Sequence, residues 1–298
     1  MTLLQLKYFL TVCKFQTVSD AATFLYVSQP SLSASIKELE KEFGVALFQR
    51  HHHGMTLTPE GETLYRSAQS LLEQAKQVET VMNDFSKTCK TLRLGVPPMI
   101  GSLILARIYR NFLQKYDNVR LEITEGGREE LTKKLNDGLL DMVFLPHNKP
   151  IESRFSCLQV GGLEIVCCAT KNNPISKLNS VQMTQLAPTP LVLFENSFFQ
   201  TEEIKKRFAK EQISPNILMQ TNQLSTLINI IAQDVAVGFV FKELIVKREN
   251  LIGIPLAEPM QVNVSLIWKK DVYFSNAMQA FKDFVANQNL LKSDLSNE

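Results

Sequence analysis

The 298-residue chain has little of what marks several specialised classes of protein. Its five cysteines are odd in number and unevenly spaced, which does not favour a disulfide framework. No stretch approaches the ~18 uninterrupted apolar residues that a membrane-spanning helix needs. The first segment, MTLLQLKYFLTVCKFQ, lacks an early basic cluster and a small-residue cleavage site, which argues against a signal peptide. These absences predict a cytoplasmic protein with no membrane partner.

Charge of one sign is also missing. The formal net charge is +2, and residues 1–58 carry five lysines and arginines against four acidic residues, a net of about +1. Most DNA-binding domains are more basic than this. Charge alone therefore does not indicate a nucleic-acid partner, and any such prediction has to come from the residue pattern.

The motifs of common enzymes are absent. The sequence has no phosphate-binding glycine loop, no His-Glu-x-x-His zinc helix and no hydrolase nucleophile elbow. Cys167 and Cys168 are neighbours on an expected strand, which favours one core and one surface thiol over a redox pair. Adjacent histidines at 51–53 alternate in direction and do not favour a metal site. We expect no enzyme activity, no metal and no cofactor.

The first forty-five residues have the pattern of a helix-turn-helix. Thr17 begins a short helix with a small inner face at Ala21 and Ala22, after an amphipathic first helix. Ser28 is a good N-cap for the next helix, and Gly44 a left-handed C-cap. The buried stripe of that helix is expected at four positions: Leu32, Ile36, Leu39 and Phe43.

If that stripe faces inward, a polar patch must face outward at the start of the second helix. Its side chains can pair with base edges, and the helix N-terminus with the Ser28 hydroxyl can hold a phosphate. The alternative is an ordinary helical hairpin whose polar face is only solvated. The expected DNA-binding residues on this helix are Ser28, Gln29, Pro30, Ser31, Ser33, Ala34 and Lys37.

Two further segments favour the DNA-binding interpretation. Leu47–Arg50 and Leu57–Thr58 read as short strands joined by a polar turn containing Gly54, the form of a wing, with Arg50 and His53 placed to meet DNA. Pro59 then opens a long helix, to about Thr88, with an apolar seam in heptad steps. That seam predicts dimerisation, although one helix packed on its own domain is the alternative; its residues are Leu64, Ala68, Leu71, Ala75, Val78, Met82 and Phe85.

From residue 90 the expected strands and helices alternate, which predicts an α/β (mixed) fold with a largely parallel sheet. Gly161-Gly162 is a natural hinge, after which the pattern restarts, so we expect two lobes around a cleft. Ligands in such folds bind at carboxyl ends of strands and at helix N-termini. That rule nominates an effector site at Pro98, Met99, Ile100, Gly127, Arg128, Pro146, Phe194 and Glu195.

These residues together resemble the LysR-type transcriptional regulators. The resemblance is carried by Ala21-Ala22-x-x-Leu25, Ser28-Gln29-Pro30-Ser31-Leu32-Ser33, Leu47-Phe48, Arg50 and Leu57-Thr58-x-x-Gly61, and more loosely by Leu92-Arg93-Leu94-Gly95 and Gly138-Leu139-Leu140-Asp141. It implies a winged helix-turn-helix at 1–58, a linker helix at 59–89 and a two-lobed, periplasmic-binding-protein-like domain at 90–298. Within that domain, lobe I would comprise 90–161 and 266–298, and lobe II 162–265.

The resemblance also implies a function. Such a regulator binds double-stranded operator DNA as a dimer or as a tetramer made of two dimers, works with RNA polymerase, and responds to a small-molecule effector in the interlobe cleft. The alternative is a soluble small-molecule binding protein whose N-terminal helices serve only oligomerisation.

Several positions depart from the family pattern. Ala34 stands where the family commonly has arginine, and His53 near where it has a basic residue, which implies altered or weaker DNA recognition. Met99 replaces a hydroxyl residue that often meets the effector, which favours a less polar ligand or a weaker hold on a carboxylate. Asp234 and Ala236 replace two usual glycines.

Overall fold

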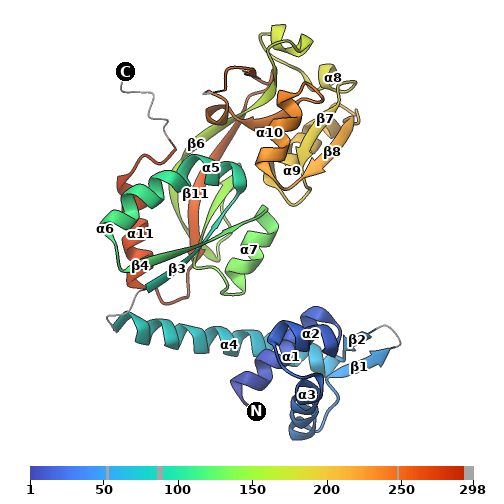
Figure 1. Ribbon diagram of the computed structural model, residues 1–298, viewed down its shortest axis with the longest axis vertical. Helices are drawn as coiled ribbons and strands as arrows, with labels where there is room; N and C mark the ends of the chain where they lie inside the picture. Colours follow the sequence, from blue (N-terminus) through green and yellow to red (C-terminus); the bar gives the residue numbers. More distant parts are fainter. Residues whose placement is uncertain (52–53, 86–89, 247, 292–298) are drawn as a thin grey trace. The chain divides into compact units, whose positions relative to one another are not determined.

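The computed structural model describes residues 1–51, 54–85, 90–246 and 248–291, with the backbone alone at residues 50 and 83. The chain forms two compact units, Met1–Phe85 and Ser86–Glu298 (Figure 1). Within the described residues, no helix is both long enough and apolar enough to cross a membrane.

The first unit begins with three helices, α1 (Leu3–Phe15), α2 (Val18–Leu25) and α3 (Gln29–Phe43). Their starts are closed as the sequence predicts: the Thr17 hydroxyl accepts the Asp20 amide at 3.1 Å, and the Ser28 hydroxyl accepts that of Ser31 at 3.3 Å. Gly44 ends α3 at φ 69°, in the left-handed region that favours glycine.

The expected buried stripe of α3 is confirmed except at its last member. Leu32, Ile36 and Leu39 are buried in the core of this unit, together with Leu6 and Phe9 of α1. Phe43 is 42% exposed, contrary to prediction, because it lies in the last turn of α3, where the helix runs past the core.

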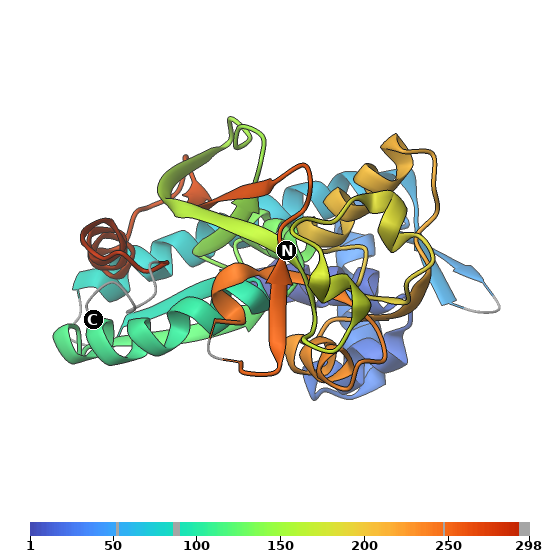
Figure 2. The ribbon, with the colours of Figure 1, turned by 90° about the horizontal axis from the view of Figure 1, so that it is seen from above.

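A hairpin follows, formed by β1 (Phe48–His51) and β2 (Gly54–Leu57), which pair antiparallel with Phe48 opposite Leu57. The Met55 amide donates to the Gln16 carbonyl at 2.8 Å and so ties β2 to the end of α1. A side chain at Gly54 would come within 2.9 Å of that same oxygen, so glycine permits the close approach. Figure 2 shows the hairpin extending away from the helices of its unit.

Helix α4 (Pro59–Phe85) begins at Thr58, whose side chain is almost fully buried. The Thr58 hydroxyl donates to the Ala46 carbonyl at 2.7 Å and accepts the Gly61 amide at 2.9 Å. Gly61 itself lies against the preceding chain, because a Cβ there would meet the Leu47 carbonyl oxygen at 2.1 Å. The start of the long helix is therefore built into the core of the first unit.

The second unit is organised on one seven-stranded sheet in the order β10-β6-β11-β5-β3-β4, with β9 paired to β6. The strands are β3 (Lys90–Val96), β4 (Val119–Glu125), β5 (Met142–His147), β6 (Phe155–Thr170), β9 (Gly238–Phe241), β10 (Leu251–Ile254) and β11 (Met260–Lys269). Strands β7 (Leu191–Phe194) and β8 (Ile217–Thr221) form a separate parallel pair.

The prediction of a largely parallel sheet is only partly right. Strand β3 is parallel to β4 and β5, but β11 is antiparallel to both β5 and β6, and β9 and β10 are antiparallel to β6. The two long strands, β6 and β11, run side by side from one group of elements to the other (Figure 1). Because the two strands are antiparallel, the chain runs between the two groups in one direction along β6 and in the other along β11.

Gly161 and Gly162 do not form the flexible hinge that the sequence predicts. They lie inside β6 and pair with Val264 and Asn263 of β11. The register shifts here, since Val264 faces Gly161 and Ser265 faces Gln159, which leaves Val160 as the extra residue of a β-bulge. The crossing is thus a bent, continuous ladder.

The helices of this unit cover the sheet and join its strands. They are α5 (Pro98–Arg107), continued by a π-helical turn (Ile108–Phe112) and α6 (Leu113–Lys115), then α7 (Arg128–Asn136), α8 (Met183–Leu186), α9 (Phe199–Lys210), α10 (Leu224–Ala232) and α11 (Asn276–Asn287), with 3₁₀ turns at Pro174–Lys177 and Lys242–Leu244. The residue pattern predicts helices at Ser102–Lys115 and at about Arg128–Asn136. Helix α7 has the predicted bounds, whereas α5 begins four residues earlier than predicted, at Pro98.

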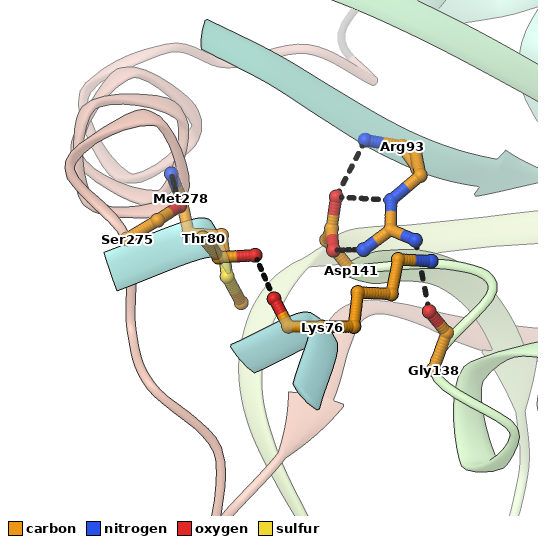
Figure 3. Close-up of polar contacts among 7 residues, drawn as sticks. All are labelled: Lys76, Thr80, Arg93, Gly138, Asp141, Ser275 and Met278. Atoms are coloured by element: carbon orange, nitrogen blue, oxygen red, sulfur yellow. Dashed lines mark hydrogen bonds and ion pairs between the residues drawn. The ribbon is translucent and has the colours of Figure 1, made fainter. Parts of the chain in front are cut away.

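Two of the loosely family-like segments meet in an ion pair (Figure 3). The Arg93 guanidinium on β3 contacts both carboxylate oxygens of Asp141, and its Nη1 donates to the Gly138 carbonyl at 2.9 Å. The Arg93 backbone amide donates to Asp141 as well, at 2.7 Å. A bidentate pair of this kind fixes the turn before β5 against β3.

Cys167 and Cys168 are both buried, so the expectation of one surface thiol is wrong. Their stretch of β6 pairs with β9 on one edge and β10 on the other, and both of its faces are covered. Burial raises the pKa of the Cys168 thiol to about 12 and that of Cys167 further, which keeps both protonated and unreactive.

Candidate nucleic-acid interface and ligand cavity

The structure places the predicted DNA-binding residues of α3 together on one outward face. Most of their side chains are exposed and Ser33 is half-buried; the exposed ones are Ser28, Gln29, Pro30, Ser31, Ala34 and Lys37. Proline at the second helical position carries no amide, and the Ser28 hydroxyl takes the amide of Ser31. The face is therefore polar, compact and directed away from the core.

The wing contributes less that can be described. Arg50 lies in β1 opposite Met55, but its side chain is outside the described set, and so is the whole of His53. The neighbouring His51 ring shares a 2.8 Å hydrogen bond with the Thr56 hydroxyl across the hairpin. Such a cross-strand bond holds the two strands of the wing in register.

Tyr26 is a candidate that the sequence reasoning missed. It ends α2 in the left-handed conformation at φ 56°, rare for a bulky residue, and its side chain is 97% exposed. It stands two residues before Ser28, the first residue of the recognition helix. The sequence did contain a signal for this candidate, because a large aromatic residue stands in the turn of the predicted helix-turn-helix.

The apolar seam of α4 is divided between two environments. Ala68 is fully buried in the core of the first unit and Leu64 packs against that core, so both serve their own chain and depart from the predicted partner contact. Ala75 is half-buried. The later seam residues are exposed: Leu71 at 39%, Val78 at 63%, Met82 at 62% and Phe85 at 80%.

In the second unit, a cavity lies where three helices begin. It is narrow: about 20 Å³ is open to the centre of a water molecule, and part of the surrounding space is open to solvent. Its lining includes six of the eight predicted effector residues: Pro98, Met99, Ile100, Arg128, Pro146 and Phe194. Arg128 is the one charged residue among the lining side chains.

Gly127 and Glu195 are the two predicted effector residues that do not line the cavity. Gly127 lies so close to Ser197 that a Cβ would come within 2.6 Å of the Ser197 carbonyl oxygen. Glu195 is exposed, and its backbone amide donates to the Thr221 carbonyl at 3.1 Å. Both positions shape the loops around the cavity and leave its interior to other residues.

Pro97, in the same nominated loop as Pro98, also lines the cavity. The other lining residues were missed from the sequence: Ile165, Phe198, Phe199, Gln200 and Phe241. Three of them, Phe198-Phe199-Gln200, form the start of α9, shortly after the nominated Phe194 and Glu195. The available signal was a glutamine within an otherwise apolar helix start.

The three helices that begin at the cavity share an unusual feature. Helix α5 starts at Pro97, α7 at Gly127 and α9 at Phe198, and none of these residues caps its helix with a side chain. Uncapped first turns present backbone N–H groups and the positive end of the helix dipole. The Arg128 guanidinium adds a full charge, 5.8 Å from the centre of the Phe199 ring.

A polar contact links α9 to the chain after β5. The Asn148 side-chain amide donates to the Glu203 carboxylate at 2.6 Å. The neighbouring Glu202 has a lowered pKa because it accepts a hydrogen bond from Lys206, with a smaller contribution from Arg128. Neither carboxylate is among the side chains that line the cavity.

The family departure at Asp234 has a structural explanation. Asp234 occupies φ 57°, the region that glycine would occupy without strain. Its carboxylate accepts hydrogen bonds from the Thr170 hydroxyl at 2.9 Å and the Asn173 amide at 2.8 Å, which hold this loop on the end of β6. Ala236 is buried nearby in the chain leading to β9.

No group of three histidine, cysteine, aspartate or glutamate side chains suitable for a metal ion occurs in the part of the chain that the structure describes.

Two family models match the chain. The model of bacterial regulatory helix-turn-helix proteins of the lysR family matches residues 3–62, and the model of the LysR substrate binding domain matches residues 86–289. Among curated relatives, the HTH-type transcriptional regulator YwbI of Bacillus subtilis is 29% identical over 287 residues, 94% of each chain. The regulator CzcR of the same organism is 26% identical and covers 97% of this chain and 99% of its own.

Solved structures match across nearly the whole chain. A full-length OxyR variant from Pseudomonas aeruginosa has a TM-score of 0.67 at 21% identity, covering 98% of this chain and 100% of that one. Full-length CbnR in complex with its target DNA has a TM-score of 0.64 at 18% identity, covering 97% and 100%. At these identities the similarity is one of fold.

Proposed function

Because this chain belongs to the LysR family of transcription regulators, which join a DNA-binding helix-turn-helix to an effector-binding domain, we propose which of its residues perform each task. Helix α3 and the wing contact operator DNA, the exposed seam of α4 pairs two chains, and the cavity at the starts of α5, α7 and α9 holds the effector. The observation that carries this proposal is the outward polar face of α3 over its buried stripe.

On DNA, the first half of α3 is the recognition surface. Gln29 can pair bidentately with adenine, Ser31 and Ser33 can reach several base edges, and Lys37 can meet phosphate or guanine. The Ser28 hydroxyl oxygen caps the helix, while its proton can be donated to a phosphate. Tyr26, fully exposed just before Ser28, adds an aromatic hydroxyl directed at the DNA backbone. With Ala34 in place of the usual arginine, base recognition rests on the uncharged residues.

Pairing of two chains follows from the exposed half of the α4 seam. Leu71, Val78, Met82 and Phe85 recur at heptad spacing, and an apolar stripe of this kind is stabilised when a second helix covers it. A symmetric dimer doubles the number of phosphate contacts, which offsets the weak basic charge of one DNA-binding unit. Tetramers formed by two such dimers and contact with RNA polymerase extend the same proposal.

Ser33→Glu tests the DNA-binding surface. A carboxylate at this half-buried position would face the bases and phosphates, and we expect it to weaken binding to the chain's own upstream DNA by about tenfold or more. The measurement is a gel shift at two salt concentrations, with oligomeric state followed by size-exclusion chromatography. Ser70→Glu, which adds the same charge on an exposed part of α4, is the matched control and should change affinity little. Unchanged affinity in Ser33→Glu would contradict the assignment.

The same gel shift tests the effector site without knowledge of the ligand. The low-molecular-mass fraction of an extract of the native host should alter the affinity or the footprint of the wild type. Met99→Trp places a large side chain in the cavity and should abolish that response while DNA binding is retained. A response that survives in Met99→Trp would place the effector elsewhere, and ligand binding without any DNA affinity would favour a plain binding protein.

A further inference from the structure

The cavity assigned to the effector is narrow because aromatic side chains fill most of it. About 20 Å³ is open to the centre of a water molecule, which is room for roughly one water. Phe194, Phe198 and Phe199 are each at most 7% exposed, and the first two rings stack with their centres 4.9 Å apart. A packed interior of this kind does not yield space without rearrangement. An organic molecule therefore enters only if the walls of the cavity move apart.

These walls belong to two groups of elements, which the crossing strands β6 and β11 join (Figure 1). One group, the α7 side, supplies the starts of α5 and α7 and the end of β5; the other, the α9 side, supplies the end of β7 and the start of α9. The two sides touch at Gly127, where a Cβ would come within 2.6 Å of the Ser197 carbonyl oxygen. Contacts that hold one side on the other therefore keep the cavity closed.

Two contacts between side chains also hold the sides together. The Arg128 guanidinium of α7 lies 5.8 Å from the centre of the Phe199 ring of α9, within the range of a cation–π interaction. The Asn148 side-chain amide, in the chain after β5, donates to the Glu203 carboxylate of α9 at 2.6 Å. Because its acceptor is charged, this second contact is a hydrogen bond of the stronger kind.

The contact between Asn148 and Glu203 acts on the cavity without being part of it. Neither residue is among those that line the cavity. Asn148 follows the lining residue Pro146 by two positions, and Glu203 lies one helical turn after the start of α9. Glu203 also pairs with Lys206 at 2.9 Å, but both belong to α9, so that pair does not join the two sides. Changing Asn148 or Glu203 therefore alters the closure of the cavity and leaves its lining intact.

We propose that Asn148 and Glu203 form a latch that sets how much effector the protein needs. The inference rests on the proposed function, in that the cavity is the effector site. A molecule that enters only the open arrangement has an apparent affinity equal to its intrinsic affinity multiplied by the fraction of chains that are open. The latch lowers that fraction, so it raises the effector concentration at which DNA binding responds. Asn148 and Glu203 are thus positioning residues, which act on the effector without touching it.

Thiol labelling of the full-length chain measures the opening without any effector. Met99→Cys places a thiol in the lining, where Met99 is 7% exposed, and dithiodipyridine reacts with it only when the cavity opens. The rate from the chain's own cysteines is measured in the wild type and subtracted. Adding Glu203→Ala should raise the labelling rate by about three- to tenfold, the scale of one partly exposed hydrogen bond to a charged group.

Glu202→Ala is the matched control for that variant. Glu202 pairs with Lys206 as Glu203 does, whereas the Asn148 amide donates to Glu203. The two substitutions therefore remove the same charge from the same turn of α9, and only one of them removes the latch. In the Met99→Cys chain, Glu202→Ala should change the labelling rate by less than about twofold.

The extract experiment measures the consequence for DNA binding. The low-molecular-mass fraction is diluted in series, and the concentration that gives half of the full change in the gel shift is compared between variants. Glu203→Ala should lower that concentration by the factor by which it raises the labelling rate, and Asn148→Ala should do likewise. The double variant should equal either single one, because both remove the same contact, whereas independent effects on stability would add. Circular dichroism shows whether each variant is folded.

Three results would overturn the proposal. Equal labelling rates with and without Glu203→Ala, or additive effects of Glu203→Ala and Asn148→Ala, would show that the contact does not hold the cavity closed. A higher extract requirement in Glu203→Ala would show that the contact belongs to the effector-bound arrangement. Faster labelling together with an unchanged extract requirement, or with no response of the wild type to extract, would place the effector elsewhere. In that last case the contact does close the cavity, and it is the proposed function of the cavity that fails.

Discussion

Helix starts are handled in opposite ways in two regions of this molecule. In the first unit every helix begins at a hydroxyl residue whose side-chain oxygen accepts a first-turn amide: Thr2, Thr17, Ser28 and Thr58. Around the cavity of the second unit, α5, α7 and α9 begin at Pro97, Gly127 and Phe198, which offer no such oxygen. The same unit caps α11 with Ser275, whose hydroxyl accepts the Met278 amide at 3.2 Å (Figure 3).

The difference follows the task of each region. A small helical domain buries little apolar surface, so hydrogen-bonded caps at its helix starts contribute a larger share of its stability. A ligand site gains from amides that are still unpaired, because the ligand then supplies partners that the chain does not. On the proposed function, an effector bound in the cavity would supply partners to these amides and so stabilise the second unit.

Among the capped helices, Thr58→Val should give the largest change in unfolding free energy. It removes the cap of α4, whose hydrogen bond to the Gly61 amide is buried, and the part-buried hydrogen bond to the Ala46 carbonyl, and we expect the first unit to lose about 2 kcal/mol of unfolding free energy. Guanidinium unfolding followed by circular dichroism reports both units, whereas Trp268 fluorescence reports the second alone. The control is Thr63→Val, on the exposed side of α4, and an unchanged dichroism transition would contradict the role of Thr58.

Thr17→Ala tests a cap at the surface and should have an intermediate effect. The Thr17 hydroxyl serves one amide, that of Asp20, so the expected loss is about 1 kcal/mol. The exposed Ser19→Ala, two residues further on, should change stability by less than about 0.5 kcal/mol. The same dichroism titration measures the loss of stability in both variants. Equal losses would show that the Thr17 hydroxyl does not stabilise α2 as a cap.

Gln223→Asp should give the smallest change, in the opposite direction. Helix α10 also begins without a side-chain cap, at Gln223. Its residues do not line the cavity, so a ligand bound there would not reach its first-turn amides. An aspartate there can accept a first-turn amide and should raise the stability of the second unit by about 0.5 kcal/mol. The readout is the Trp268 fluorescence transition. Asn222→Asp adds the same charge outside the helix and should stabilise less; a loss in Gln223→Asp would show that this end is already satisfied.

Local signals in the sequence were enough to predict the first unit. Thr17, Ser28 and Gly44 act within one helical turn of themselves, and the spacing of Leu32, Ile36 and Leu39 describes one helix face. Phe43 has the same spacing but lies beyond the core, and only the position of the neighbouring helices shows this. Ala68 fits both a partner seam and its own core, and periodicity cannot distinguish them.

The cavity was predicted in part, because its residues come from separate segments. The rule that ligands bind at strand ends and helix starts found Pro98, Arg128 and Phe194. It missed α9 because Phe198 and Phe199 read as core, and it placed the start of α5 too late because a double proline reads as a loop, although proline is tolerated in a first turn. The contact between Asn148 and Glu203 joins positions 55 residues apart, and no local pattern in the sequence predicts it.

The paired crossing strands β6 and β11 also set how the second unit can move. Both connections between its lobes belong to one hydrogen-bonded ribbon, bent at the bulge of Val160, with no loop to act as a free joint. A change in the angle between the two groups of elements that this ribbon joins would therefore have to twist or bend the ribbon itself.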